Sequence, residues 1–304
     1  MEQQTPKAAI RRRWIAVGEM LVVMLIWSSS FIGVKVALRS AGPLTVAGLR
    51  YFLAFVCLLP WLVVRRRSWV HFGASLWLRF SGMGLAQYTI GNGVLYIAMQ
   101  TLTATDGSLA MCLLPIPVSI LGMTLLKEPA TWTRFGGLAL AIGGSALYFS
   151  RNLTPGRPQA FALLGIAVFC ASAFPVLGRG LARDRKTETA ALTALPLGIG
   201  GGVLLLLAGA FEGVPHMPVA AWGLIVGLAV GNTLIPYVLY MHALQTLHAG
   251  EASVLVSLTP LGTSLIAVST LHEQLVPHQF GAIVMMIAGA GLILRRGQAS
   301  KGDS

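Results

Sequence analysis

The sequence predicts an all-α integral membrane protein whose ten transmembrane helices form two five-helix inverted repeats. Three observations support this prediction: an apolar composition, an internal duplication and an uneven distribution of basic residues. Of the 304 residues, 55% are hydrophobic and only 11% are charged, whereas soluble domains carry about 25% charged residues. The chain has too few charges to cover a water-facing surface, so a lipid bilayer is its expected surroundings.

Apolar runs recur along the whole chain, and a helix of about 20 apolar residues crosses the hydrocarbon layer of a bilayer. The predicted spans are 15–38, 44–64, 79–99, 104–126, 132–150, 160–180, 190–211, 221–244, 252–271 and 278–295. The first run follows Arg11, Arg12 and Arg13 as in a signal peptide, but it continues to Leu38 without a small-residue cleavage site. We therefore interpret it as a retained helix.

The basic residues predict the orientation of these spans. With the N-terminus in the cytoplasm, seventeen Lys and Arg residues fall on the inner side and three on the outer side. Cytoplasmic loops are enriched in these residues, so both termini are expected inside. The net charge of +12 therefore reflects membrane orientation, and nucleic acid is not an expected partner. Cys57, Cys112 and Cys170 lie within apolar runs, which disfavours disulfides and a metal site.

The segment Gln100–Arg151 occurs a second time as Gln245–Arg296, with a constant shift of 145 positions and no gap. About fifteen of the fifty-two paired positions are identical. Residues 1–151 and 152–304 are thus expected to be copies of one five-helix unit. Because five is odd, the second copy enters the membrane from the opposite side, as in many secondary transporters, whose substrate site lies near the midplane between the halves. The alternative is a duplicated scaffold without transport.

Several motifs in fixed order resemble one known family. They are Trp27-Ser-Ser-Ser-Phe31 with Lys35, Leu49-Arg50-Tyr51, Leu126-Lys-Glu128-Pro followed by Phe135-Gly136-Gly137, and the counterparts Leu271-His-Glu273 and Phe280-Gly281. In this order and duplicated spacing the chain resembles the drug/metabolite transporter superfamily, specifically its ten-helix EamA-type family. The resemblance covers nearly the whole chain. It implies ten helices, cytoplasmic termini and export of amino acids, metabolites or toxic organic compounds.

Small polar residues form a stripe in the fourth span and again in the ninth. The spacing of 4, 3 and 4 residues places them on one helix face. The stripe consists of Ser108, Cys112, Pro115 and Ser119, and its counterpart of Ser253, Ser257, Pro260 and Ser264. A proline frees a backbone carbonyl, which is tolerated where a helix lines a wet or protein-filled space. Two interpretations remain open: the stripes line a substrate cavity, or they allow close helix packing.

Aromatic and amide side chains at mid-membrane depth form a second candidate set. Their polar groups are costly in lipid, so they are expected to face the bundle interior. The set comprises Tyr88, Asn92 and Tyr96 in the third span, Tyr237 and Tyr240 in the eighth, Trp27 and Ser30 in the first, and Ser172 in the sixth. Gly91 and Pro236 correspond by the repeat and are expected to bend both helices at one level. The alternative role is hydrogen bonding between helices without a ligand.

Charged residues within the spans receive structural roles. Lys35 and Arg50 are expected to extend to the outer surface, although Lys35 could instead hold a substrate carboxylate. Asp106 and Glu251 open their helices and are expected to cap them. Glu19 is expected to pair with the arginines that precede it. The small four-helix multidrug relatives use an embedded glutamate for proton exchange, and the absence of such a carboxylate at mid-depth disfavours tight proton antiport.

The leading functional hypothesis is a monomeric secondary transporter that exports a small organic solute across the bacterial inner membrane. An amino acid with an aromatic or other apolar side chain would suit an aromatic and small polar lining without a fixed central charge. Alternatives are an exporter of drugs or other metabolites, and a facilitative uniporter or exchanger of a different substrate class. No metalloprotease helix motif or serine elbow indicates an enzyme, and neither a metal nor a cofactor is implied.

Overall fold

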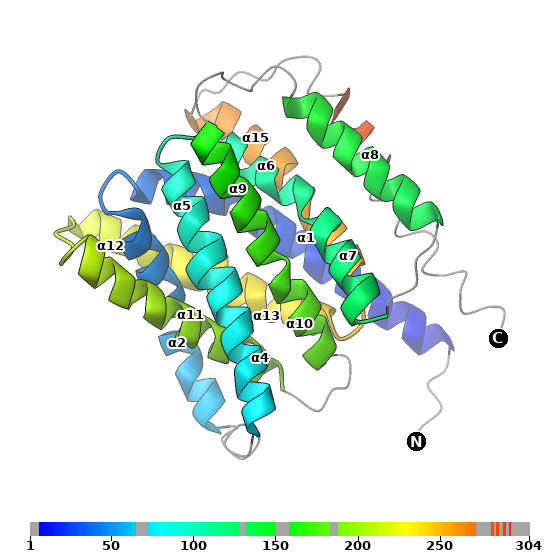
Figure 1. Cartoon of the computed structure of the whole chain (residues 1–304), viewed down its shortest axis with the longest axis horizontal. Helices are drawn as coiled ribbons and strands as arrows, with labels where there is room; N and C mark the ends of the chain where they lie inside the picture. The colour runs from blue at the N-terminus through cyan, green and yellow to red at the C-terminus, as the bar shows by residue number, and fades with distance from the viewer. Residues whose placement is uncertain are drawn as a thin grey trace.

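The computed structural model describes residues 6–64, 72–127, 132–149, 158–182 and 188–271, together with seven positions between 281 and 292. In this part of the chain the structure is a bundle of helices without strands (Figure 1). The elements are α1 (Pro6–Ala37), α2 (Pro43–Val64), α4 (Ala74–Gly84), η1 (Leu85–Asn92), α5 (Gly93–Met99), α6 (Ala104–Leu113), α7 (Pro115–Leu125), α8 (Trp132–Phe149), α9 (Pro158–Ala171), α10 (Ala173–Ala182), α11 (Thr189–Phe211), α12 (Val219–Ala229), η2 (Val230–Leu234), α13 (Ile235–Ala243), α14 (Ala249–Val256) and α15 (Thr259–Leu271).

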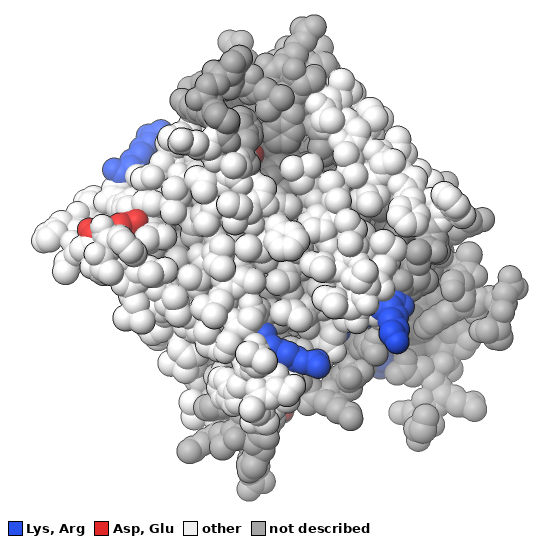
Figure 2. Space-filling view, in the orientation of Figure 1, with Lys and Arg blue, Asp and Glu red and all other residues white. Residues whose placement is uncertain are grey.

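Nine of the ten predicted spans overlap helical segments of the structure. The tenth, 278–295, lies largely outside the described residues. Six helices are long and apolar enough to cross a membrane, and they span Ile10–Ala37, Pro43–Val64, Ala162–Ala182, Thr189–Phe211, Val219–Ala243 and Ala249–Thr270. On the face in Figure 2, a broad central zone of the described surface carries no charged side chain, as a lipid-facing surface requires. The count of ten spans stays a prediction.

Three of the helical segments break next to a proline. Proline lacks a backbone N–H and collides with the carbonyl four residues earlier, so it interrupts a helix interior but suits the first positions of a new helix. Pro115 begins α7, Pro175 follows the break at Ser172 between α9 and α10, and Pro260 follows the break between α14 and α15. Pro115 and Pro260 are related by the 145-residue shift, so both copies break at the same place.

The π-helical segments η1 and η2 are also related by the repeat, because Leu85 and Val230 differ by 145 positions. Each lies between two α-helical pieces of one continuous segment. A π-helical turn inserts an extra residue into the i→i−4 ladder and often occurs at functional sites. The sequence places Gly91 and Pro236 at this level, and the structure shows that the regular helix is interrupted in both copies.

Basic side chains cap the ends of α5 and α13 in an equivalent way. Lys35 Nζ donates to the carbonyls of Met99 and Leu102, both at 2.6 Å. Arg179 donates to the carbonyl of Leu244 at 2.6 Å, and Leu244 corresponds to Met99 by the repeat. Cations at helix C-termini satisfy free carbonyls and oppose the helix dipole. The ammonium of Lys35 is thus held by backbone carbonyls at the end of α5, and its extension to the outer surface stays a prediction.

The expected capping by Asp106 and Glu251 is confirmed. The backbone N–H of Thr103 donates to Asp106 Oδ2 at 3.1 Å, and the Asp106 N–H donates to Thr103 Oγ1 at 3.0 Å. The His248 N–H donates to Glu251 Oε2 at 3.0 Å. Both copies therefore begin their fourth segment with a carboxylate that satisfies a free N–H at the helix start.

Glycines allow α11 to pack closely against α2 and α4 in the middle of the bundle. A Cβ at Gly84 would lie 2.6 Å from the Pro196 carbonyl oxygen, and one at Gly201 would lie 2.7 Å from the Phe52 backbone nitrogen. Small residues of this kind let helix backbones approach each other within membranes. This packing fixes α2 and η1 beside α11, and both of them contribute side chains to the cavity described next.

Candidate functional site

A cavity of about 70 Å³ lies among side chains from both copies of the repeat. The first copy contributes from α1, α2, η1, α5 and the break between α6 and α7, and the second copy from α9, α10 and α13. The lining residues are Trp27, Ser30, Phe31, Val34, Arg50, Tyr51, Gln87, Gly91, Asn92, Leu95, Tyr96, Met99, Leu114, Ala167, Ala171, Phe174, Pro175, Tyr237 and Tyr240. None of these lining residues is Asp or Glu.

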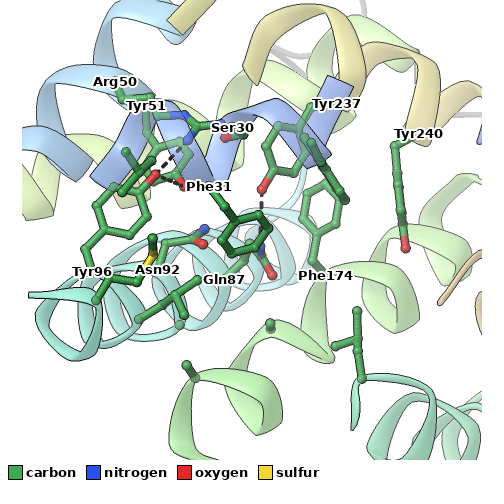
Figure 3. Close-up of a pocket in the computed structure, with 18 of the residues that line it drawn as sticks. Ser30, Phe31, Arg50, Tyr51, Gln87, Asn92, Tyr96, Phe174, Tyr237 and Tyr240 are labelled. Atoms are coloured by element: carbon green, nitrogen blue, oxygen red, sulfur yellow. Dashed lines mark hydrogen bonds between the residues drawn. The ribbon is translucent and has the colours of Figure 1, made fainter. Parts of the chain in front are cut away.

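One end of the cavity is a wall of aromatic rings from three helices. The ring centroid of Tyr237 lies 5.1 Å from that of Trp27 and 5.1 Å from that of Phe174. Tyr240 stacks on Trp27 at 5.7 Å with an interplanar angle of 27°. Figure 3 shows Phe174, Tyr237 and Tyr240 together at this end. Such packed rings present an apolar, weakly polarised surface to a ligand.

The opposite end is polar and centred on the guanidinium of Arg50. Its Nε donates to Thr233 Oγ1 at 2.6 Å, one terminal nitrogen donates to Tyr96 OH at 2.8 Å, and the other donates to the Asn232 carbonyl at 2.8 Å. The Tyr51 and Tyr96 hydroxyls lie 3.2 Å apart. Figure 3 shows Arg50, Tyr51 and Tyr96 grouped at this end.

Between the two ends lie amide side chains from η1. Gln87 Nε2 donates to Tyr237 OH at 3.2 Å. Asn92 Nδ2 and the hydroxyl of Tyr88, whose ring packs 5.3 Å from that of Tyr237, are buried without a hydrogen-bond partner among the described residues. A buried polar atom without a partner is unfavourable, and in a native structure such atoms often mark a place where water or a ligand binds.

The arrangement can bind a solute but lacks the groups of a hydrolytic or metal site. Among the described residues, no cluster of three His, Cys, Asp or Glu side chains could hold a metal ion. The lining combines one cation, neutral polar groups and aromatic rings. Pockets of this kind recognise small molecules by apolar contact and a few polar anchors.

Comparison with known proteins identifies the family. The model of the EamA-like transporter family matches residues 14–150 and again 159–295. The chain belongs to this family. The two matches begin 145 positions apart, the same shift that superimposes the two sequence copies, so the resemblance predicted from the motifs is confirmed.

Relatives of this EamA-like protein carry transporter names. It is 28% identical to an uncharacterized transporter of Archaeoglobus fulgidus over 90% of this chain and 94% of the relative. It is also 28% identical to an S-adenosylmethionine/S-adenosylhomocysteine transporter of Chlamydia trachomatis over 88% of this chain and 85% of the relative. A solved crystal structure with 14% identity shares the fold, with a TM-score of 0.76 over 94% of this chain and 98% of that chain. The protein is a membrane transporter and not an enzyme.

Six of the predicted site residues of this EamA-like transporter meet at the cavity. They are Trp27, Ser30, Asn92, Tyr96, Tyr237 and Tyr240. Tyr88 lies behind the lining, where its ring packs against Tyr51 at 4.9 Å and Phe174 at 5.9 Å. Pairing polar residues between the third and eighth spans by the 145-residue shift was the signal that found most of these positions.

The small polar stripes lie outside the cavity lining. Ser108, Ser253 and Ser257 are almost fully buried, and each hydroxyl donates to a carbonyl three residues earlier in its own helix. Ser172 likewise donates to the Phe169 carbonyl. Their hydrogen-bonding capacity is thus used locally, which favours the packing interpretation. Pro115 and Pro260 are buried at the helix breaks, and the side chain of Cys112 lies outside the described residues.

Arg50 was the main residue that sequence reasoning missed. It lies seven residues after the start of α2 at Pro43, about 10 Å along the helix axis, and its side chain turns inward. It is 4% exposed, so the predicted extension to the outer surface is wrong. The expectation of a lining without a fixed charge is wrong for the same reason. The depth of Arg50 along its helix does not predict that its side chain turns inward, because two of its acceptors belong to the other copy of the repeat.

Two further charge pairings differ from the sequence expectation. Glu19 Oε1 accepts a hydrogen bond from His242 Nδ1 at 2.7 Å, and among the described residues Glu19 does not pair with the preceding arginines. Arg13 instead pairs with Glu251 at 2.8 Å. Both contacts join α1 to the second copy. Glu128 and Glu273, which belong to the family motifs, lie outside the described residues.

Proposed function

We propose that this transporter exports a small organic solute, an amino acid with an aromatic or other apolar side chain, across the bacterial inner membrane by alternating access. The observation that carries the proposal is the composition of the cavity, where an aromatic wall faces a polar end across two amide side chains. An amino acid has a matching polarity, with its charged groups at one end and its side chain at the other. Facilitated export or exchange fits the absence of Asp and Glu from the lining.

The size of the cavity supports a small solute. Its volume of about 70 Å³ is well below the roughly 300–1,000 Å³ typical of sites for drug-sized ligands. An amino acid needs less widening of the bundle than a drug or a nucleotide-linked metabolite does. The transporter is proposed to act as a monomer, because side chains from both copies within one chain complete the cavity.

The proposed topology is ten helices in two inverted five-helix repeats with both termini in the cytoplasm. It is supported by the basic residues of the predicted inner loops and by the equivalent interruptions η1 and η2. In inverted-repeat transporters the solute binds between the halves, and rocking of one half against the other exposes it alternately to the two sides. The cavity between the copies is the proposed solute site, about which the two halves rock.

Counterflow in proteoliposomes tests this function. Purified protein is reconstituted with unlabelled L-phenylalanine or L-leucine inside, and uptake of the labelled amino acid is followed. Ser30 lines the cavity and is 5% exposed, so Ser30→Phe should fill it and abolish counterflow. Ser269, exposed on α15, provides the matched control, and Ser269→Phe should retain counterflow. Absence of counterflow in folded wild-type protein, for every amino acid of a full panel, would reject amino-acid export.

A second candidate substrate is S-adenosylmethionine or its demethylated product. The specific observation in its favour is the 28% identity to a relative named as a transporter of these compounds. Both also carry an amino-acid group, which could occupy the same polar end. Labelled S-adenosylmethionine in the same counterflow assay separates the two candidates, since a nucleoside-bearing solute needs a cavity much wider than the one observed.

A further inference from the structure

The cavity contains a buried cation without a buried anion. Arg50 is 4% exposed, and no carboxylate of the described residues forms an ion pair with it. Its hydrogen-bond partners are a hydroxyl of Thr233, a hydroxyl of Tyr96 and the Asn232 carbonyl, all neutral. The ring of Tyr51 lies 5.4 Å from the guanidinium carbon. Burying a charge among neutral groups is unfavourable unless a further partner compensates it.

The guanidinium also has hydrogen-bonding capacity to spare. Arginine has five N–H donors in a planar fork, and the three hydrogen bonds to Thr233, Tyr96 and Asn232 use one donor on each nitrogen. One N–H on each terminal nitrogen remains, and charge-assisted hydrogen bonds from a guanidinium to a carboxylate are among the strongest in proteins. Arg50 lines the cavity, so an anion entering it can reach this donor pair.

The internal repeat also supports a binding role for Arg50. The 145-residue shift sets Arg50 opposite Leu195, so only the first copy supplies the charge. Its acceptors Asn232 and Thr233 belong to η2 of the second copy. The cation therefore bridges the two copies at the level of their repeat-related interruptions, where a bound solute would contact both.

We propose that Arg50 is the binding site for a carboxylate of the transported solute. This inference rests on the proposed function and names the charge that the solute must carry. The carboxylate accepts from the two free N–H donors of Arg50, while the apolar part of the solute packs toward Phe174, Tyr237 and Tyr240. Asn92 Nδ2, which lacks a partner among the described residues, is the third donor in the same space.

The proposal predicts which solutes are excluded. An organic cation without a carboxylate meets a fixed positive charge in a medium of low dielectric, where repulsion is much stronger than in water. The transporter should therefore accept zwitterions and anions with an apolar group and reject the corresponding amines. Exporters of cationic drugs need the opposite charge in the cavity.

Wild-type protein gives the first test, with no substitution needed. Three related probes compete against labelled L-phenylalanine in counterflow: unlabelled L-phenylalanine, 3-phenylpropionate and 2-phenylethylamine. They share the ring and differ in the charged groups. A hydrogen bond to a charged group typically changes affinity by about tenfold to a hundredfold. We expect phenylethylamine to compete at least about tenfold more weakly than phenylpropionate. Equal competition by the amine and the acid would overturn the proposal.

Substitution of Arg50 gives the second test. Arg50→Gln should weaken phenylpropionate competition by at least about tenfold, and Arg50→Lys should recover part of it because the charge returns without the fork. Arg39, exposed between α1 and α2, supplies the control Arg39→Gln, which should leave competition unchanged. If phenylpropionate competes as strongly in a folded Arg50→Gln variant as in the wild-type protein, the proposal is contradicted. If that variant does not fold, the wild-type comparison of acid and amine decides.

A binding assay separates the failure of this inference from the failure of the proposed function. Thermal shifts of detergent-purified protein are measured with 3-phenylpropionate and with 2-phenylethylamine. Stabilisation by the acid alone, without counterflow of any amino acid, would uphold the carboxylate site and reject amino-acid export. Counterflow of amino acids with equal stabilisation by acid and amine would uphold export and reject the role of Arg50.

Discussion

Replacing Tyr237 tests whether the aromatic wall contacts the solute. Its ring is 4% exposed and packs against Trp27, Tyr88 and Phe174 with centroid distances between 5.1 and 5.3 Å. Its hydroxyl accepts from Gln87. Two substitutions separate these contributions, because Tyr237→Phe removes only the hydroxyl and Tyr237→Leu removes the ring while keeping an apolar side chain.

The structure gives a magnitude for each change. Tyr237→Phe leaves the Gln87 donor without its acceptor, which costs about 1–3 kcal/mol of stability. Tyr237→Leu loses three ring pairs worth about 0.5–1.5 kcal/mol each, a total of about 1.5–4.5 kcal/mol. Contact between the Tyr237 ring and the solute should contribute a similar free energy to binding, and about 1.4 kcal/mol corresponds to a tenfold change in affinity.

Amino-acid counterflow in proteoliposomes, together with thermal unfolding in detergent, measures both effects. We expect Tyr237→Phe to keep the wild-type KM within about threefold and Tyr237→Leu to raise it by about tenfold. Phe169, 64% exposed on α9, supplies the control Phe169→Leu, which should change neither quantity. A folded Tyr237→Leu variant with the wild-type KM would refute the assignment of the aromatic wall to solute binding.

Three further predictions concern packing, capping and a surface pair. In thermal unfolding, Gly200→Ala should lower stability by about 1–3 kcal/mol, because its Cβ would lie 2.7 Å from Tyr88 Cβ. The control Gly209→Ala should be neutral or stabilising, because its Cβ would meet nothing within 4 Å. Lys35→Met should lower the unfolding temperature, because it frees two carbonyls at the end of α5, and an unchanged temperature would argue against the cap. His242→Ala should leave counterflow within about twofold, because the pair with Glu19 is partly exposed and exposed pairs contribute about 0–1 kcal/mol. Complete loss of transport would instead assign His242 a role in the transport cycle.

Hydrophobic runs and the duplication were sufficient to predict the helices. Nine of the ten predicted ranges overlap helical segments of the described residues, because burial in lipid requires long apolar helices and this requirement is local in the sequence. The residues paired between the third and eighth spans also met as expected. Tyr88 and Asn92 on one copy and Tyr237 and Tyr240 on the other face one another because polar groups within lipid must find protein partners.

The roles of Arg50 and Ser108 could not be predicted in the same way. Arg50 at its helix depth fits either a surface or an interior position, and the choice depends on acceptors in η2 that belong to the other copy. Ser108 lies on a polar face, but its hydroxyl bonds to the carbonyl of Thr105, an option open to any helical serine. Spacing defines a helix face, whereas the neighbour that the face meets depends on the whole fold.

Accessibility of a cysteine at position 30 tests most directly whether the cavity between the copies is a transport pathway. Ser30→Cys is introduced after Cys57, Cys112 and Cys170 are replaced, and membrane-impermeant thiol reagents are added to either side of the membrane. The account predicts labelling from both sides and protection by the transported amino acid. A cysteine that reacts from one side only, without protection by any solute that the protein moves, would contradict it.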